Sequence, residues 1–251
     1  MTTFDQYILI DDLVLHRIIR YADIHHRDVV LEIGAGTGVL TEELMKCAGR
    51  VIAIESDASL VRLLNQRFKN TSAEIIHGDA LEIEFPRFNK VVSNLPYSIS
   101  SPITFKLLRY PFERAVLMYQ YEFARRMAAA PGSKDYGKLS ICVQYHADVE
   151  LLEIVPGAAF SPQPDVRSAI VRLIPRAPEY NVLDYGFFSK FLTAIFSQRR
   201  KKLKNSIGAF TNVRDLGLPD DVLNKRPEEL PAKRLAEISD IIYSRTRLPC
   251  S

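Results

Sequence analysis

The chain has 251 residues, 47% of them hydrophobic, and a formal net charge of +3, which is enough apolar material for one large domain or for a large and a small one. It contains no run of about 18 apolar residues and no signal peptide, so we expect a soluble, cytoplasmic protein without a membrane segment. Cys47, Cys142 and Cys250 are far apart and form no Cys-x-x-Cys pair, which argues against disulfides and against a metal site.

From about residue 28, short β-branched runs alternate with amphipathic helical patterns, which is typical of a parallel sheet covered by helices. We therefore expect an α/β fold with a doubly wound, Rossmann-like sheet. Strands are predicted over 29–33, 50–54, 74–76, 90–93, 114–118, 141–146 and 169–173, and helices over 41–47, 58–68, 103–108 and 121–130.

The composition changes at residues 175–178, where two prolines bracket a short segment. Proline disfavours both helix and sheet, so this segment is predicted to be a linker. Beyond it, apolar residues recur at helical spacing between Phe187 and Phe196, and again between Leu235 and Ile242. The sequence thus predicts a large domain over residues 1–175 and a small helical domain over residues 176–251.

A glycine-rich turn follows the first predicted strand. Gly34, Gly36 and Gly38 let the backbone approach a ligand where a side chain would clash. A nicotinamide-type loop needs the spacing G-x-G-x-x-G to bring a pyrophosphate to the helix N-terminus, and Val39 occupies the position of its third glycine. The spacing therefore favours a nucleoside cofactor without phosphates. Alone, the triplet also fits an ordinary strand-to-helix turn.

Two carboxylates stand at the ends of the next two predicted strands. Glu55 can accept hydrogen bonds from the ribose hydroxyls of a nucleoside, and Asp79 can accept from the amine of the cofactor's own adenine. The carboxyl ends of parallel strands line one crevice, so both acids are expected beside the glycine turn. Singly, each acid could be a solvated loop residue; the ordered set favours a cofactor site.

The fourth predicted strand ends in the turn Asn94-Leu95-Pro96-Tyr97. The exocyclic nitrogen of adenine is a poor nucleophile because its lone pair is delocalised into the ring. The Asn94 side-chain oxygen and the Leu95 carbonyl can accept its two hydrogens and make it more tetrahedral, while Pro96 stiffens the turn and Tyr97 offers a ring for stacking. An Asn-x-Pro-Tyr loop with a core tyrosine is the alternative, and it is disfavoured only by the cofactor residues that precede it.

Together these residues resemble the ribosomal RNA adenine N6,N6-dimethyltransferases that modify small-subunit RNA. The resemblance runs almost from end to end, and the short tail and residues 94–105 look more like the archaeal and eukaryotic branch than the bacterial one. The stretches that carry it are 6–11, 32–38, Glu55, 78–80, 94–102, 119–126 and 160–166.

The resemblance implies a cofactor, S-adenosylmethionine, and the dimethylation of two adjacent adenines in a hairpin near the 3′ end of small-subunit RNA, during ribosome assembly. It implies that the segment around Tyr7 caps the methionine portion of the cofactor. The family usually has Asn or His at that position, so a side-chain and a backbone contact both stay open. Phe160 is implied as a second aromatic wall for the target base. The candidate cofactor-binding residues are Gln6, Tyr7, Leu9, Gly34, Gly36, Glu55, Asp79 and Asn94, and the candidate catalytic residues are Asn94, Leu95, Pro96, Tyr97 and Phe160.

The basic part of the chain is its tail. Residues 176–251 carry 14 Lys+Arg and 9 Asp+Glu, whereas residues 1–175 carry 19 and 21. The cations of residues 199–204, which follow the helical pattern of Phe187–Phe196, could hold RNA phosphates, although a solvated helix face is the alternative. We expect a monomer whose domain 1–175 binds the cofactor and performs catalysis and whose domain 176–251 docks small-subunit RNA or an assembly intermediate. The candidate RNA-binding residues are Arg199, Arg200, Lys201, Lys202 and Lys204.

Two other functions stay open from the sequence. One is methylation of an adenine of large-subunit RNA, as in macrolide-resistance methyltransferases, which have similar motifs and typically a different tail. The other is a non-catalytic assembly or transcription factor that keeps the pocket, against which the intact turn 94–97 argues.

Overall fold

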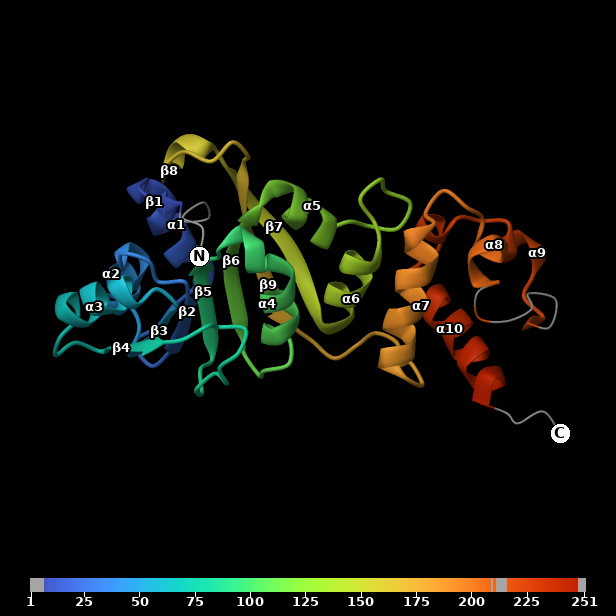
Figure 1. The fold of residues 1–251 in the computed structure, drawn as a ribbon, viewed down its shortest axis with the longest axis horizontal. Helices are drawn as coiled ribbons and strands as arrows, with labels where there is room; N and C mark the ends of the chain where they lie inside the picture. The colour runs from blue at the N-terminus through green and yellow to red at the C-terminus, as the bar shows by residue number, and fades with distance from the viewer. Residues whose placement is uncertain (1–6, 209, 211–215, 248–251) are drawn as a thin grey trace. The chain divides into compact units, whose positions relative to one another are not determined.

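The computed structural model describes residues 7–208, 210 and 216–247, which fold into two compact units (Figure 1). The first unit contains the chain up to Ala124 together with Ala147–Arg176, and the second contains Arg125–His146 together with the chain from Ala177. The expectation that everything before residue 176 forms one domain does not hold for Arg125–His146, because this segment packs on the helices of the second unit.

A sheet of seven strands in the order β4-β3-β2-β5-β6-β9-β7 forms the first unit. The first five strands run parallel, whereas β9 is antiparallel to both β6 and β7. The doubly wound, Rossmann-like α/β sheet expected from the sequence is confirmed, and its strands are antiparallel at this one edge. Only antiparallel strands can be joined without a crossover, and β7 and β9 are separated in the chain by only a short segment, residues 156–167. The strands are β2 (Val29–Ile33), β3 (Arg50–Glu55), β4 (Ala73–His77), β5 (Lys90–Asn94), β6 (Arg114–Gln120), β7 (Ala147–Val155) and β9 (Ser168–Pro175).

Helices cover this sheet, and the first of them precedes the region where the sequence predicts any element. Asp11 caps this helix, α1, by accepting hydrogen bonds from the backbone N–H groups of Leu13, at 2.9 Å, and Val14, at 3.1 Å. Helix α5 begins in the first unit and ends in the second. The elements are α1 (Asp12–Ala22), α2 (Val39–Met45), α3 (Ala58–Arg67), η1 (Tyr97–Ile99), α4 (Ser100–Leu107), α5 (Tyr121–Met127) and η2 (Gly157–Ala159).

The core of the first unit lies between the sheet and its helices. Strands β2, β3 and β5 are almost continuously buried, as expected when a parallel sheet is covered on both faces. On one face, Val30, Val51 and Val92 pack with buried residues of α1 and α2. Because the faces of these strands are covered, a ligand can reach them only at their ends. The predicted site residues lie at the carboxyl ends.

A second, two-stranded ladder joins two distant motifs. Strand β1 (Ile8–Leu9) pairs antiparallel with β8 (Phe160–Ser161), with Leu9 opposite Phe160. The N–H of Ile10 extends the ladder by donating to the carbonyl of Ala159 at 2.9 Å. The segment expected to cap the cofactor is thus held by the segment that contains Phe160.

The second unit is helical. Residues 141–146, predicted as a strand, belong to α6, and the strand begins only at Ala147. The contacts of α6 explain the helix: it packs on α7, the Ser140 hydroxyl donates to the carbonyl of Arg126 at 2.7 Å, and Gln144 donates to the carbonyl of Met127 at 2.8 Å. No helix among the described residues is long and apolar enough to cross a membrane. The elements are α6 (Lys138–His146), α7 (Tyr185–Ser197), α8 (Leu203–Ile207), α9 (Asp220–Leu223), η4 (Pro227–Glu229) and α10 (Ala232–Arg247).

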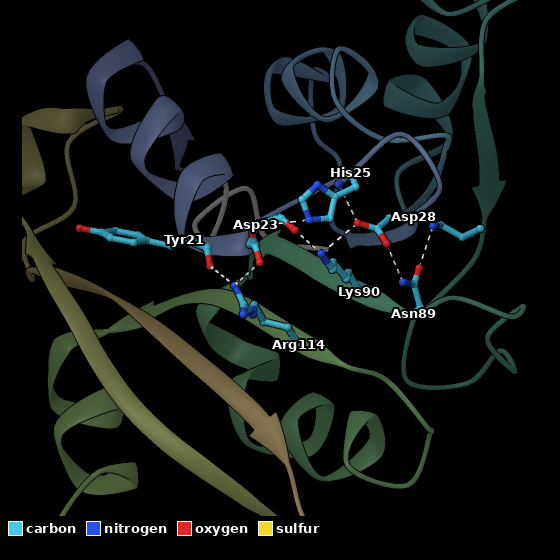
Figure 2. Close-up of polar contacts among 8 residues, drawn as sticks. Tyr21, Asp23, His25, Asp28, Asn89, Lys90 and Arg114 are labelled. Carbon is cyan, nitrogen blue, oxygen red and sulfur yellow. Dashed lines mark hydrogen bonds and ion pairs between the residues drawn. The ribbon is translucent and has the colours of Figure 1, made fainter.

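Figure 2 shows a buried ion pair at the amino end of the sheet, opposite the edge where the site residues stand. The Lys90 ammonium lies 2.9 Å from the Asp28 carboxylate, and both side chains are buried. Asn89 donates to the same carboxylate at 2.7 Å, and so does the backbone N–H of His25, also at 2.7 Å. Although burial raises the pKa of Asp28, these hydrogen bonds and the Lys90 charge hold it below its usual value. The cluster fastens the loop after α1 to β5.

Candidate active site

A cavity of about 450 Å³ opens at the carboxyl ends of β2, β3 and β5, within the size range of small-ligand sites. It lies in the first unit, and it brings together predicted site residues from the whole first hundred positions of the chain. Gln6 is outside the described residues. The predicted residues that line the cavity are Tyr7, Leu9, Gly34, Gly36, Glu55, Asp79, Asn94, Leu95, Pro96 and Tyr97.

The glycine turn lies against the turn of residues 94–97 that follows β5. Gly34 has a φ of +74°, and a Cβ built there would stand 3.1 Å from Cδ of Pro96, so a side chain would be strained and crowded. Gly36 has a φ of +58°, and its N–H donates to the Glu55 carboxylate at 2.9 Å. The turn is therefore shaped by both of its neighbours, the turn after β5 and the end of β3.

Glu55 is buried and held by three backbone donors. Its Oε1 accepts from the N–H groups of Ser56 at 2.8 Å and Asp57 at 2.9 Å, and its Oε2 accepts from Gly36. A carboxylate has about four acceptor positions, two on each oxygen. Both positions of Oε1 and one of Oε2 are used, so one position remains on Oε2. The carboxylate is thus fixed in orientation and can accept from a ligand hydroxyl mainly through Oε2.

Asp79 shapes the turn after β4. Its Oδ1 accepts from the N–H of Leu81 at 2.8 Å, and its backbone carbonyl accepts from Glu82 at 2.9 Å and Ile83 at 3.0 Å. No described residue donates to Oδ2. This oxygen is available to a donor in the cavity, such as the amine of an adenine.

Asn94 ends β5 and has a fixed side-chain orientation. Its Nδ2 donates to the backbone carbonyl of Tyr7 at 3.0 Å. Because a carbonyl can only accept, the amide nitrogen must face Tyr7 and the amide oxygen must face away from it. No described residue donates to Oδ1 of Asn94 or to the carbonyl of Leu95. The two acceptors that the sequence predicts for an adenine amine are therefore both available beside the cavity.

The ring of Tyr97 is held from two sides. Its hydroxyl lies 2.6 Å from Oγ of Ser168, a fully buried residue of β9, and its ring centroid lies 5.5 Å from that of Tyr7 at an interplanar angle of 32°. A ring separation of this size is typical of aromatic pairs. Tyr7 therefore contributes its carbonyl to Asn94 and its ring to Tyr97.

Glu32 also lines the cavity, and the sequence analysis gives it no role. It is 2% exposed, and the Thr41 hydroxyl donates to it at 2.6 Å. Burial, together with the charge of Glu55, raises its pKa to about 8, while the Thr41 hydrogen bond opposes this shift. The sequence does contain a signal for this residue, because Glu32 is an acid inside the otherwise apolar strand 29–33. Burial of a carboxyl is costly, so an acid at such a position indicates a specific role.

Phe160 does not lie in the cavity wall. It is 3% exposed and packs in the core with Leu9, Val14 and Val155. Pairing of Phe160 with Leu9 turns its side chain into the core beneath the N-terminal strand, whereas the sequence predicts a second aromatic wall at this position. In this structure, the ring beside Tyr97 is that of Tyr7.

In the cationic segment of the second unit, residues 199–202 lie between two helices, and Lys204 lies on the second of them. Helix α7 ends at Ser197, and α8 begins at Leu203. Arg199 is engaged inside the unit, since it donates to the carbonyl of Ser133 at 3.1 Å and lies 3.9 Å from Glu228. The cations that remain exposed in this segment are Arg200, Lys201, Lys202 and Lys204.

Comparison with known proteins covers nearly the whole chain. The model of the family described as ribosomal RNA adenine dimethylase matches residues 1–243. A curated relative from Methanosarcina acetivorans, named "Probable ribosomal RNA small subunit methyltransferase A", is 51% identical and covers 96% of this chain and 93% of its own.

Solved structures agree with this assignment. A dimethyladenosine transferase from Plasmodium falciparum has a TM-score of 0.80 at 31% identity, covering 92% of this chain and 95% of that one. The 23S rRNA methyltransferase ErmE has a TM-score of 0.70 at 28% identity, covering 93% and 99%. The chain belongs to the ribosomal RNA adenine dimethylase family, whose methyl donor is S-adenosylmethionine.

Proposed function

We propose that the protein transfers methyl groups from S-adenosylmethionine to N6 of two adjacent adenines in the 3′-terminal hairpin of small-subunit ribosomal RNA, during ribosome biogenesis. Support for the small subunit comes from the names of relatives that cover nearly the whole chain at 45 to 51% identity. Support for the chemistry comes from the turn after β5 and from the cavity beside it.

The observation that carries the proposal is the fixed orientation of Asn94. With its nitrogen committed to the carbonyl of Tyr7, the amide presents an oxygen to the substrate, and the carbonyl of Leu95 supplies a second acceptor. Two acceptors aimed at the two hydrogens of an exocyclic amine stabilise the pyramidal nitrogen and its developing positive charge. The base is proposed to stack on Tyr97, and the amine then needs no separate general base, because its proton can leave to water after transfer.

The residues of the cavity fit the cofactor. Glu55 would hold a ribose hydroxyl through Oε2, Asp79 would accept from the adenine amine through Oδ2, and the backbone of Gly34 and Gly36 would lie close to the ligand. The sequence segment around Leu9 would cover the methionine portion. When bound, S-adenosylmethionine supplies an activated methyl group on a cationic sulfur, and the role of the protein is to place the amine in line with it.

Dimethylation changes what the turn has to do. After the first transfer the amine carries one methyl and one hydrogen, so only one of the two acceptors can be engaged in the second transfer. Both acceptors keep their positions after the first transfer, because the Leu95 carbonyl belongs to the backbone and the Asn94 oxygen is fixed through the bond to Tyr7. We propose that either acceptor can serve the second transfer, according to how the methylated amine is turned.

The second unit is proposed to dock the RNA. Lys201, Lys202 and Lys204, with Arg200, are exposed cations in one short segment, and cations of this kind bind phosphates with a marked dependence on salt. Arg199 is removed from this set because it already bonds within the unit. We also propose that the protein acts as a cytoplasmic monomer.

The test is methylation of isolated ribosomal subunits with radiolabelled S-adenosylmethionine, followed by nucleoside analysis. We expect label in N6,N6-dimethyladenosine from the small-subunit RNA and none from the large-subunit RNA. Label in the large subunit alone would mean an ErmE-like substrate. Cofactor binding without transfer to either subunit would instead favour a non-catalytic factor.

A further inference from the structure

A lysine on α4 holds the turn that carries Asp79. The ammonium of Lys106 donates to the carbonyl of Leu81 at 3.2 Å and also to the carbonyl of Ile83, and it lies 4.6 Å from the centroid of the Phe85 ring. These acceptors all belong to residues 81–85, the segment that leaves the carboxyl end of β4. The side chain of Lys106 is half-buried, and its contacts are neutral carbonyls and a ring face in place of a carboxylate.

The two carbonyls that Lys106 holds belong to the same turn as the Asp79 carboxylate. The N–H of Leu81 donates to Oδ1 of Asp79, and the N–H of Ile83 donates to its backbone carbonyl. Each of these two residues therefore bonds to Asp79 through its nitrogen and to Lys106 through its oxygen. A displacement of the ammonium would displace the carboxylate with it.

A second contact fastens the same segment to the end of α4. The Tyr110 hydroxyl donates to the Glu84 carboxylate and accepts from the N–H of Phe85 at 3.3 Å, and its ring packs on that of Phe85 at 5.0 Å. Helix α4 is itself continuous with η1, which begins at Tyr97. The turn of Asp79 and the turn that is proposed to bind the target base are thus attached to one helical segment.

We infer that Lys106 is a positioning residue, which fixes the Asp79 carboxylate against the cofactor's adenine and ties that contact to the helix that follows the base-binding turn. The inference rests on the proposed function, because it takes Asp79 as the acceptor for the adenine amine. Lys106 does not line the cavity, so we expect its effect to be on affinity and on discrimination by the cofactor site.

The test compares two ligands by calorimetry, S-adenosylhomocysteine and its analogue in which the purine lacks the 6-amino group. In the unaltered protein we expect the analogue to bind roughly tenfold more weakly, because one hydrogen bond to a charged acceptor is lost. In Lys106→Met we expect S-adenosylhomocysteine to lose most of this advantage, while the analogue binds nearly as before. In Asp79→Ala, which has no acceptor for the amine, the two ligands should bind with equal affinity. In Lys106→Arg, part of the difference in affinity between the two ligands should be retained.

The matched control is Lys69→Met, which removes an exposed lysine of the same unit and should leave both affinities unchanged. At saturating S-adenosylmethionine, turnover of Lys106→Met should return close to that of the unaltered protein, whereas general damage to the fold would lower it. Hydrogen exchange of the amides of residues 78–85 should be faster in Lys106→Met than in Lys69→Met or in the unaltered protein.

The outcomes separate the two proposals. If the unaltered protein binds both ligands equally, the assignment of Asp79 in the proposed function is wrong, and the role of Lys106 falls with it. If the unaltered protein discriminates and Lys106→Met discriminates equally well, Lys106 does not position Asp79, and the proposed function stands.

Discussion

The side-chain nitrogen of Asn94 donates to the backbone carbonyl of Tyr7 at 3.0 Å, across 87 positions of the chain. This contact joins the N-terminal strand to the turn proposed to bind the target base, and it decides which atom of the amide is offered to a substrate. An amide whose nitrogen is already bonded presents its oxygen, which is the atom that an adenine amine requires.

Replacement of Asn94 by Ala should lower turnover much more than cofactor affinity. The lost acceptor is engaged by the substrate amine as it becomes pyramidal, so we expect kcat to fall by about 10²-fold or more. Asn94→Asp tests the orientation, since a carboxylate keeps the acceptor and loses the donor to Tyr7. Single-turnover rates and calorimetric cofactor affinities check both variants, and an equal loss of rate and affinity would contradict this role.

Glu55→Gln should have the reverse effect. Its carboxylate faces the cavity through Oε2 and is held by three backbone N–H groups, so the amide weakens both the contact to a ribose hydroxyl and the turn itself. We expect the dissociation constant of S-adenosylmethionine to rise roughly tenfold, with turnover at saturation closer to normal. Unchanged cofactor binding would refute the ribose assignment.

Tyr97→Phe and Ser168→Ala remove the same hydrogen bond from its two ends. Each should lower kcat/KM for RNA by about threefold to tenfold, because the ring proposed to stack on the base loses one of its supports. Since both variants break one contact, the double variant should be little worse than either single one. Effects that simply add would show that the two residues act independently.

Cofactor affinity should depend on pH through Glu32. The pKa of this buried carboxyl is raised to about 8, so at pH 6.5 it is mostly protonated, and a cationic ligand in the cavity favours its ionised form. Binding therefore releases a proton below pH 8, and affinity rises with pH until it levels off above pH 8. We expect S-adenosylmethionine to bind roughly tenfold more tightly at pH 8.5 than at pH 6.5.

Glu32→Gln should flatten this dependence, and the exposed Glu113→Gln should not. The titration of the ligand itself is common to all three proteins and cancels in the comparison. Parallel pH profiles for Glu32→Gln and the unaltered protein would remove Glu32 from the cofactor site.

The buried pair in Figure 2 predicts a large effect on stability. Lys90→Met leaves the Asp28 carboxylate buried without its cation, and the free energy of unfolding should fall by about 3 kcal/mol. The double variant with Asp28→Asn should recover part of this loss, because no buried charge remains. Arg50→Met, which breaks an exposed pair with Glu74, should cost under about 1 kcal/mol. Urea denaturation measures all three.

Much of the site could be predicted from the sequence because its residues follow local patterns. Runs of β-branched residues identified β2, β3 and β5, and a parallel arrangement of strands necessarily brings their carboxyl ends to one edge. Glu55, Asp79 and Asn94 could therefore be assigned to one cavity before any contact was known, and all three line it.

What only the tertiary structure decided depends on partners far away in the chain. Residues 141–146 are as apolar and β-branched as a strand, yet they form a helix because they pack on α7. Phe160 is turned into the core by its pairing with Leu9, and Arg199 donates to the carbonyl of Ser133 and forms an ion pair with Glu228.

The turn of residues 94–97, which we propose binds the target base, shows both sides of this division. Its sequence alone indicated an acceptor amide followed by a backbone carbonyl, since these groups are properties of the residues themselves. The direction in which the amide points was decided by the carbonyl of Tyr7, which reaches it only when the N-terminal strand pairs with β8. A side-chain orientation is set by the contact that satisfies it, and that contact exists only in the folded chain.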